Sequence, residues 1–331
     1  MSPRPRAVVL HGATADRPDE VDTLVQAEMV ADILRRSGWT VRIVATGLDL
    51  SALDRLLTPR PDAVFNLVEA LGGDGRLGHL VPGVLEHLGI PFTGASAATL
   101  FATTLKPMTK ALLRGAGLPT PDWISPDGTA WHSEAFDRMI VKAAAEDASL
   151  GIDSGSVVPA ASAAAEVARR AARHGGDWFA EAYIDGREFN VGLLEDESGP
   201  RVLPIAEILF VDYPEDRPRI VDYEAKWVED SFAYNNTPRQ FDLPPTDAPL
   251  LAELGDLARR AFTLFGLRGY GRVDFRVDAE GRPWILEINA NPGLSPDAGF
   301  AAAATRAGLA MDDVVRQIVR IASRKEAQAA A

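Results

Sequence analysis

The sequence predicts a mixed α/β protein, with a parallel α/β domain at its N-terminus and two α+β domains after it. Short apolar strand patterns alternate with helical patterns through the first 93 residues, as they do in parallel sheets. Strand patterns dominate again from about residue 185 to residue 210, and residues 269–289 contain two alternating segments separated by a turn. We therefore expect three domains, at residues 1–93, 94–184 and 185–331.

The N-terminal domain is predicted from its hydrophobic periodicity. Residues 7–10 form an apolar strand pattern, and apolar residues at helical spacing then run from Val21 to Leu34, until Gly38 ends the helix. The remaining elements are two strands, a helix and a last strand, at residues 40–45, 62–68, 80–88 and 90–93. Because strands that alternate with helices usually pair in parallel, this order indicates a mainly parallel sheet.

The central domain begins near Gly94 with a long helix, residues 98–115, in which Pro107 marks a helix start or a kink. A rigid extended linker follows at residues 118–121, and a strand at 139–142 ends in a lysine. The other predicted elements are a loop of small and polar residues, a helix and a strand, at 143–155, 162–173 and 178–184.

Composition and charge narrow the class of protein. The 331 residues include 47% apolar residues, as in globular proteins, and the net charge of −13 argues against a nucleic-acid-binding protein, which would cluster Lys and Arg. The absence of cysteine excludes disulfides, thiolate metal sites and cysteine nucleophiles. The apolar run at residues 7–10 is too short for a signal peptide, and no run approaches the roughly 18 apolar residues of a membrane span. We therefore expect a cytoplasmic protein that binds neither nucleic acid nor membrane.

The predicted hairpin near the C-terminus carries a polar face with three oxygen ligands. Alternation puts Glu287 and Asn289 on one face, about 7 Å apart along the strand. The turn at residues 278–283 lets Asp274 reach the same face from the neighbouring strand. Two carboxylates and an amide oxygen are hard ligands, suited to Mg²⁺ that bridges phosphates. The alternative, a solvated face of an edge hairpin, leaves the nearby Arg272 unexplained.

Further residues outline a nucleotide site. Lys142 ends an apolar strand, where a lysine faces a cleft more often than bulk water. Glu181 can accept from an adenine amino group, the backbone up to Ile184 can contact the ring edge, and Glu188 can accept from ribose hydroxyls. Lys226 lies in a polar, loop-like segment that we interpret as facing phosphates. Ordinary surface lysines and a simple surface loop are the alternatives, but the combination favours a nucleotide.

Other ligand-binding and catalytic motifs are absent or out of context. No Gly-x-x-x-x-Gly-Lys-Ser/Thr segment occurs, so an ATP site in this chain has another design. Residues 73–78 match Gly-x-Gly-x-x-Gly, but they follow a late strand and lack an acidic ribose partner near residue 98. The five histidines have no metal-ligand spacing, and no Gly-x-Ser-x-Gly turn occurs.

Together, these residues resemble the ATP-grasp superfamily and, within it, the D-alanine–D-alanine ligase family. The resemblance extends from about residue 60 to about residue 305. It rests on motifs in family order, which are Gly89-Ile-Pro-Phe-Thr-Gly94, the helix through Lys106, Gly117-Leu-Pro-Thr-Pro121, Ile140-Val-Lys142, Glu181, Glu188, Asp222-Tyr-Glu-Ala-Lys226, Gly271-Arg-Val-Asp274 and Leu286-Glu-Ile-Asn289 with Pro292-Gly293. The resemblance implies an ATP-grasp fold, in which the central and C-terminal domains clamp ATP.

The resemblance also implies a role for each candidate residue. The ATP phosphates would be contacted by Lys106, Lys142 and Lys226. Adenine and ribose would be held by Glu181, Ile184 and Glu188. Two Mg²⁺ ions, for which Mn²⁺ can substitute, would be coordinated by Asp274, Glu287 and Asn289. The oxyanion of a tetrahedral intermediate would be stabilised by Arg272 and the Gly293 backbone N–H, and the loop at residues 146–151, with Ser149, would close over the phosphates.

The implied reaction joins a carboxylate to an amine in two steps. The carboxylate of the first substrate attacks ATP to give an acyl phosphate and ADP, and the amine of the second substrate then displaces phosphate to form an amide. The expected partners are amino-acid or amino-acid-like small molecules, and the family resemblance also suggests a homodimer. A genuine D-alanine–D-alanine ligase with an altered pocket and a nucleotide-binding protein without ligase activity are the alternatives.

The substrate-binding positions depart from the family pattern. Glu20 is the candidate to replace the glutamate that orients the first substrate's ammonium, and Trp227 stands in place of the tyrosine after the loop lysine. The substrate-linked serine of the phosphate loop is missing, which leaves Ser149 beside its position. The Ser-Leu pair that binds the second D-alanine carboxylate falls near residues 298–299, preceded by Asp297. Because lost hydrogen bonds to a substrate change specificity greatly, we do not expect two D-alanines to be the substrates.

Overall fold

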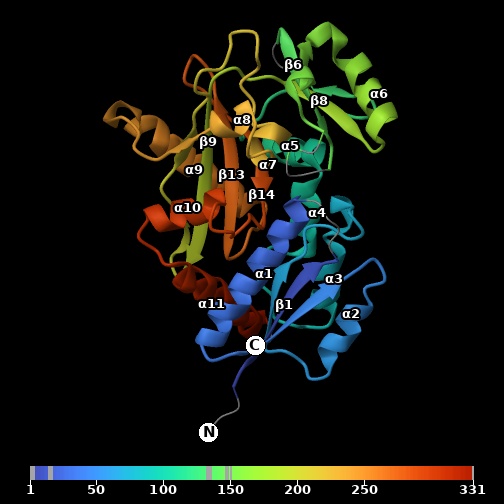
Figure 1. The fold of residues 1–331 in the computed structure, drawn as a ribbon, viewed down its shortest axis with the longest axis vertical. Helices are drawn as coiled ribbons and strands as arrows, with labels where there is room; N and C mark the ends of the chain where they lie inside the picture. The colour runs from blue at the N-terminus through green and yellow to red at the C-terminus, as the bar shows by residue number, and fades with distance from the viewer. Residues whose placement is uncertain (1–3, 14–17, 132–135, 146–148, 150, 330–331) are drawn as a thin grey trace.

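The computed structural model describes residues 4–13, 18–131, 136–145, 149 and 151–329 of the chain, which fold around three β-sheets (Figure 1). The sheets use successive sections of the sequence and lie within residues 6–67, 123–182 and 187–289. The first sheet is parallel and the other two are antiparallel, so the predicted combination of α/β and α+β units is confirmed. The domain boundaries near residues 93 and 184 stay a prediction.

The first sheet has the strand order β2-β1-β3, and all of its strands are parallel. The strands are β1 (Arg6–Gly12), β2 (Thr40–Thr46) and β3 (Ala63–Leu67). The strand predicted at residues 90–93 is wrong, because Phe92 makes only a single parallel bridge to Val64. Pro91 lacks the backbone N–H that a longer ladder would require at this edge.

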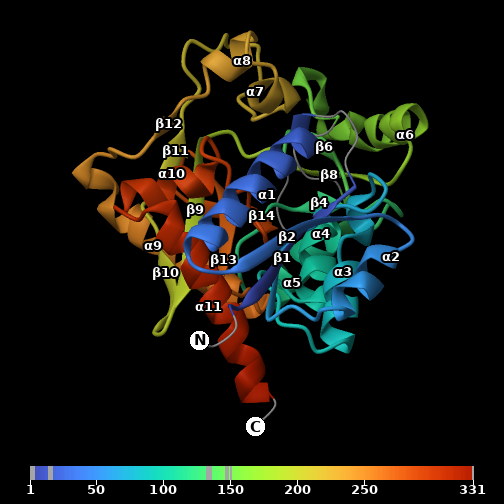
Figure 2. The same ribbon diagram turned by 60° about the horizontal axis from the view of Figure 1, so that its bottom comes forward.

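Helices cover both faces of the first sheet, and one of them comes from the far end of the chain (Figure 2). Val9 and Phe65 share an apolar cluster with Ile318 on one face, whereas Val8 points into a separate cluster on the other. Each face of β1 therefore contributes to its own core, as alternation along a buried strand requires. The helices are α1 (Pro18–Arg36) and α11 (Met311–Ala329) on the first face and α2 (Ser51–Asp54) and α3 (Leu80–His87) on the second.

The long helix predicted at residues 98–115 is two helices, α4 (Ala97–Thr104) and α5 (Lys106–Gly115). The break falls at Leu105, whose ψ of 89° is far from helical. Pro107 causes the break, because proline is unfavourable inside a helix but favourable in its first turn. Lys106 therefore begins a new helix, and its backbone N–H donates to the Ala144 carbonyl oxygen at 2.8 Å. This bond holds Lys106 beside the second sheet.

The second sheet has the strand order β5-β4-β8-β6-β7, and α6 packs against β6 and β8 (Figure 1). Its elements are β4 (Trp123–Ile124), β5 (Ala130–Trp131), β6 (Arg138–Ala143), β7 (Val157–Pro159), α6 (Ala163–His174) and β8 (Trp178–Ala182). The strands predicted at residues 139–142 and 178–184 correspond to β6 and β8, the latter two residues shorter at its end.

The third sheet has the strand order β12-β11-β9-β13-β14, with β10 paired to β9. Its strands are β9 (Arg187–Asp196), β10 (Gly199–Val202), β11 (Ala206–Ile208), β12 (Arg239–Gln240), β13 (Tyr270–Val277) and β14 (Pro283–Asn289). The predicted hairpin is confirmed, because β13 and β14 pair antiparallel with Asp274 opposite Glu287. The helices of this part of the chain are α7 (Tyr223–Trp227), α8 (Phe232–Asn235), α9 (Ala248–Leu264) and α10 (Gly299–Arg306). Across the described residues, no helix has the length and apolar character needed to span a membrane.

Candidate active site

One face of the third sheet is polar, and its residues come from three neighbouring strands. Asn190 of β9, Asp274 of β13 and Glu287 of β14 lie side by side in register. In the next row, Arg272 lies opposite Asn289. The residues between them are buried in the apolar cluster on the opposite face, against α9, and include Phe189, Val191, Val273 and Phe275. Alternation along each strand thus separates a polar face from the core.

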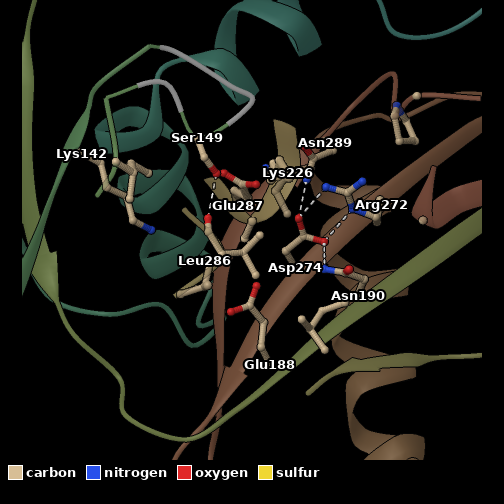
Figure 3. A pocket seen from close by; sticks show the side chains of 18 of the residues that line it. Lys142, Ser149, Glu188, Asn190, Lys226, Arg272, Asp274, Leu286, Glu287 and Asn289 are labelled. Atoms are coloured by element: carbon tan, nitrogen blue, oxygen red, sulfur yellow. Dashed lines mark hydrogen bonds and ion pairs between the residues drawn. The ribbon is translucent and has the colours of Figure 1, made fainter. Parts of the chain in front are cut away.

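Asp274 is the centre of this polar face (Figure 3). Its two carboxylate oxygens accept hydrogen bonds from Arg272 Nε and Nη2, each at 2.8 Å. They also accept from Asn190 Nδ2 at 2.8 Å and from Asn289 Nδ2 at 3.0 Å. Burial raises the pKa of Asp274, and the Arg272 guanidinium opposes that shift.

Glu287 stays ionised although it is surrounded by protein. Lys106 Nζ lies 3.9 Å from Glu287 Oε2. Burial acts to raise the pKa of Glu287, but the charges of nearby cations outweigh it and lower the pKa to about 2. These cations are Lys106, Lys226, Lys142 and Arg272. Positive charge is therefore concentrated where the sequence predicts phosphates.

The buried Glu181 carboxylate pairs with two lysines. Lys142 Nζ lies 2.5 Å from Oε1, and Lys110 Nζ lies 2.7 Å from Oε2. Burial lowers the pKa of Lys110 to about 8, although the charge of Glu181 opposes this shift. Lys110 is not among the predicted site residues, because its pairing joins α5 to β8 and leaves no local signal in the sequence.

Glu188 pairs with Arg276, another residue that the sequence analysis does not single out. Arg276 Nη2 lies 2.9 Å from Glu188 Oε2, and the two residues are opposite each other on β13 and β9. Burial raises the pKa of Glu188, and the charge of Arg276 opposes that rise. Arg276 follows Asp274 by two positions on the same strand, so the alternation that identified Asp274 could have identified Arg276 as well.

The polar face, the lysines and the surrounding loops line a cavity of about 550 Å³, a volume typical of small-molecule sites. The cavity brings together all the predicted site residues except Glu20, whose side chain lies outside the described part of the structure. The lining residues from the prediction are Lys106, Lys142, Ser149, Glu181, Ile184, Glu188, Lys226, Trp227, Arg272, Asp274, Glu287, Asn289, Gly293 and Asp297.

Two hydrogen bonds connect the second sheet's loop to the segment that carries Lys226. Ser149 Oγ donates to the Val221 carbonyl oxygen at 2.9 Å, and the Tyr223 N–H donates to the Ile152 carbonyl oxygen at 3.2 Å. Of the loop predicted to close over phosphates, residues 146–148 and 150 lie outside the described residues. Ser149 lines the cavity, and its hydroxyl connects the two segments.

Helix α1 also lines the cavity, through two residues that are not among the predicted site residues. Asp22 Oδ2 accepts from Gln26 Nε2 at 2.7 Å and from Ser295 Oγ at 3.2 Å. Gln26 Oε1 in turn accepts from the Leu294 N–H at 2.8 Å. Burial raises the pKa of Asp22, these hydrogen bonds oppose the rise, and the nearby charge of Asp297 adds to it. A carboxylate held in this way is suited to binding a cationic group.

The donor set of the polar face fits a divalent cation. Asp274 and Glu287 provide carboxylate oxygens in register, and Asn289 lies one row away with an amide oxygen available if its amide group rotates. Hard oxygen ligands of this kind are preferred by Mg²⁺ and Mn²⁺. Within the described ranges, no group of three or more His, Cys, Asp or Glu side chains offers an alternative metal site.

The cavity is lined by two antiparallel sheets, with Lys142 on one and Asp274 and Glu287 on the other, and this arrangement defines the class of ATP-grasp ligases. The comparisons with known proteins identify the family within that class. Residues 112–320 match the family described as D-ala D-ala ligase C-terminus. The chain belongs to the D-alanine–D-alanine ligase family and is an ATP-dependent carboxylate–amine ligase.

Similar proteins match most of the chain. The D-alanine–D-alanine ligase of Chromohalobacter salexigens is 36% identical over 95% of this chain and 93% of its own length. An uncharacterized protein of Sinorhizobium fredii is 33% identical over 83% of this chain and 80% of its own. The crystal structure of D-alanine–D-alanine ligase from Bacillus anthracis complexed with ATP has a TM-score of 0.75 at 19% identity and covers 98% of this chain and 99% of that chain. This structural match confirms the predicted ATP-grasp fold.

Proposed function

We propose that this protein uses ATP to activate the carboxylate of an amino acid or a related acid and joins it to an amine, with release of ADP and phosphate. The observation that carries the proposal is a single cavity in which Lys106, Lys142 and Lys226 face the ligand set of Asp274, Glu287 and Asn289. This arrangement provides positive charge for phosphates beside oxygen ligands for a divalent cation.

The nucleotide would lie between the second and third sheets. The backbone from Glu181 to Ile184 would contact the adenine edge, and Glu188 would accept from the ribose hydroxyls. Two features support this position: both carboxylates are buried at the cavity wall, and Glu181 is fixed by its pairs with Lys110 and Lys142. The ATP complex of the Bacillus anthracis ligase, which shares this fold, supports ATP as the nucleotide.

The reaction would follow two balanced steps. An oxygen of the substrate carboxylate attacks the γ-phosphorus of ATP, and the bond to ADP breaks. The nitrogen of the amine then attacks the acyl carbon, loses a proton and expels phosphate. The Arg272 guanidinium and the Gly293 N–H, which both line the cavity, would stabilise the negative charge that develops on the acyl oxygen.

The metal site would be built from Asp274, Glu287 and Asn289. Bound Mg²⁺ ions would offset the negative charge of the ATP phosphates. The residues of the chain itself orient this site: Asn190 donates to Asp274, and Lys106 lies beside Glu287.

Asp22, together with Asp297, would bind the ammonium of the acid substrate. Asp22 is held by Gln26 and Ser295 at the end of the cavity formed by α1. In this proposal Asp22 takes the role that the sequence analysis gives to Glu20. Trp227 would line the adjoining wall of the substrate space.

A panel of acids and amines tests the proposal. The full-length protein is incubated with ATP and Mg²⁺ and with pairs drawn from the common L-amino acids, D-alanine and simple amines, and ADP release is measured. We expect ADP release only when a competent acid and amine are both present. ATP binding without ADP release across the whole panel would refute the proposal and favour a nucleotide-binding protein without ligase activity.

The second candidate function is D-alanine–D-alanine ligation itself. It is favoured by the Chromohalobacter salexigens relative, which carries that name at 36% identity. Rapid phosphate release with D-alanine as the sole substrate distinguishes it from the ligation of other amino acids.

A further inference from the structure

Arg239 brings a positive charge to the cavity from the edge of the third sheet. It begins β12 and lies opposite Ile208 of β11, which in turn lies opposite Glu188 of β9. Residues directly opposite each other in antiparallel strands project from the same face of a sheet. Arg239 therefore projects from the same face as Glu188, and all three residues line the cavity.

Arg239 differs from the other cavity arginines in its pairing. Arg272 pairs with Asp274, and Arg276 pairs with Glu188. Within the described structure, Arg239 Nη1 donates a hydrogen bond to the Asp297 carbonyl oxygen at 3.4 Å. The residue is partly exposed at the cavity, and its planar guanidinium is suited to binding a carboxylate.

Arg239 lies beside Gly299 in the wall of the cavity. A Cβ atom built on Gly299 would lie 3.6 Å from Arg239 Nη2 and 3.7 Å from Nε. Residues 298 and 299 are alanine and glycine, so their side chains offer no hydrogen-bond donor. Burial and the charge of Arg272 lower the pKa of Arg239, and Asp297 opposes this shift, but an arginine remains charged at neutral pH. Arg239 is therefore a charged donor beside residues 298 and 299, whose side chains offer none.

The chemistry of amide formation indicates which substrate meets Arg239. The attacking nitrogen must be uncharged. The protein therefore cannot hold the amine substrate by an ion pair with that nitrogen. The substrate must be held through another group, and a carboxylate is the group that a free guanidinium binds best. Asp22 and Asp297 can hold the ammonium of the acid substrate, which leaves Arg239 for the amine substrate.

We propose that Arg239 binds a carboxylate of the amine substrate and thereby selects carboxylate-bearing amines, such as amino acids, over simple amines and amino-acid amides. The proposal rests on the proposed ligase function and names the class of its second substrate. Arg239 acts as a specificity-determining residue, since it binds the amine substrate through a group that does not take part in the reaction.

The test compares free acids with their amides as amine substrates. The full-length protein receives ATP, Mg²⁺ and the acid substrate that releases most ADP in the panel, together with an amino acid or the same amino acid as its amide. We expect the KM for the free acid to be about 10- to 100-fold below that for the amide, as expected for a charged hydrogen-bonded pair. Arg239→Gln should erase this preference by raising the KM of the free acid, with a smaller change in kcat and none in the KM for ATP.

Two variants and a binding measurement separate specificity from structure. Arg239→Lys should keep part of the preference, and Arg201→Gln, an exposed arginine outside the cavity, should keep all of it. Isothermal titration of the ADP-loaded protein with the free acid and with the amide should give the same preference without turnover, and Arg239→Gln should abolish it. The thermal unfolding midpoint of Arg239→Gln should stay close to that of the wild type, because among the described residues the guanidinium is joined to the fold by one long hydrogen bond, to the Asp297 carbonyl oxygen.

The outcomes distinguish the two proposals. If the wild type releases no ADP with any pair, the proposed function fails and this inference fails with it. If the wild type turns over but accepts acids and amides equally, or if Arg239→Gln keeps the preference for the acid, only the inference is overturned.

Discussion

Arg272 and Asp274 lie two residues apart on one face of β13, and Arg272 Nε and Nη2 each donate to a different oxygen of Asp274 at 2.8 Å. The same carboxylate accepts hydrogen bonds from Asn190 and Asn289, so its position is fixed by three neighbouring strands. A buried carboxylate needs such partners to remain ionised. The arginine therefore holds the proposed metal ligand in place, and in the proposed reaction it would also stabilise the charge on the acyl oxygen.

Replacing Arg272 should reduce turnover strongly while leaving the fold intact. Arg272→Lys keeps a positive charge but cannot donate two parallel hydrogen bonds to Asp274. We expect a loss of about 10²- to 10³-fold in kcat, the usual cost of removing an oxyanion-stabilising donor. ADP release under saturating substrates measures this loss. An Arg272→Lys variant that turns over at the wild-type rate would remove Arg272 from the catalytic set.

Replacing Lys110 should change how stability depends on pH. The pKa of Lys110 is about 8 in the folded protein, below the 10.5 of an ordinary lysine. Between these values the unfolded chain binds more protons than the folded chain, so this group makes stability increase as pH rises from 8 towards 10.5. Lys110→Met cannot titrate, and the wild type should therefore gain stability relative to the variant across this window.

Urea unfolding of the wild type and Lys110→Met at pH 7 and pH 9.5 measures the effect. Lys110→Met should be the less stable protein at both values, because it leaves the buried Glu181 carboxylate with one partner fewer. An equal difference in unfolding free energy at the two pH values would contradict the lowered pKa of Lys110.

Gly94 should not tolerate a side chain, because it contacts the loop that follows β14. A Cβ atom on Gly94 would lie 2.3 Å from Asn291 Oδ1, the same oxygen that accepts from the Ala95 N–H at 3.0 Å. Gly128 has nearly the same φ, +83° against +84°, but no atom within 4 Å of its Cβ position. We expect Gly94→Ala to destabilise the protein by about 1–3 kcal/mol more than Gly128→Ala. Equal unfolding free energies for the two variants would show that the contact with Asn291 has no energetic effect.

Ser149 should affect nucleotide binding through its link to Val221. Ser149→Ala removes the hydrogen bond that connects the second sheet's loop to the segment carrying Lys226. We expect the KM for ATP to increase by about 3- to 10-fold, the cost of one neutral hydrogen bond. Ser198→Ala, an exposed serine on the turn between β9 and β10, is the matched control and should not change this KM. An unchanged KM for ATP in Ser149→Ala would show that the link does not support the nucleotide site.

The sequence was sufficient for those parts of the site that follow from strand alternation. Asp274, Glu287 and Asn289 share a face because each strand alternates and one turn joins them, so local pattern alone predicts their proximity. Pro107 is also a local signal, because proline is favourable in the first turn of a helix. The sequence left open whether a helix would start at Pro107 or bend there.

The residues that were missed depend on packing between distant elements. Lys110 reaches Glu181 only because α5 packs beside β8, and Asp22 reaches Ser295 only because α1 lies against the loop after β14. Arg239 reaches the cavity because a two-residue strand pairs with β11, a pairing without a recognisable periodicity. Such contacts are set by the tertiary fold rather than by spacing along the chain.

The central claim is that the polar face of β13 and β14 is the metal-binding floor of an ATP-dependent ligase, and Glu287→Gln tests it most directly. This variant keeps the size of the side chain but removes the charge that four nearby cations stabilise. ADP release is titrated with Mg²⁺ for the wild type and the variant, and circular dichroism checks the fold. We predict that Glu287→Gln retains its fold but loses Mg²⁺-dependent turnover, whereas normal turnover at the wild-type Mg²⁺ requirement would contradict the assignment.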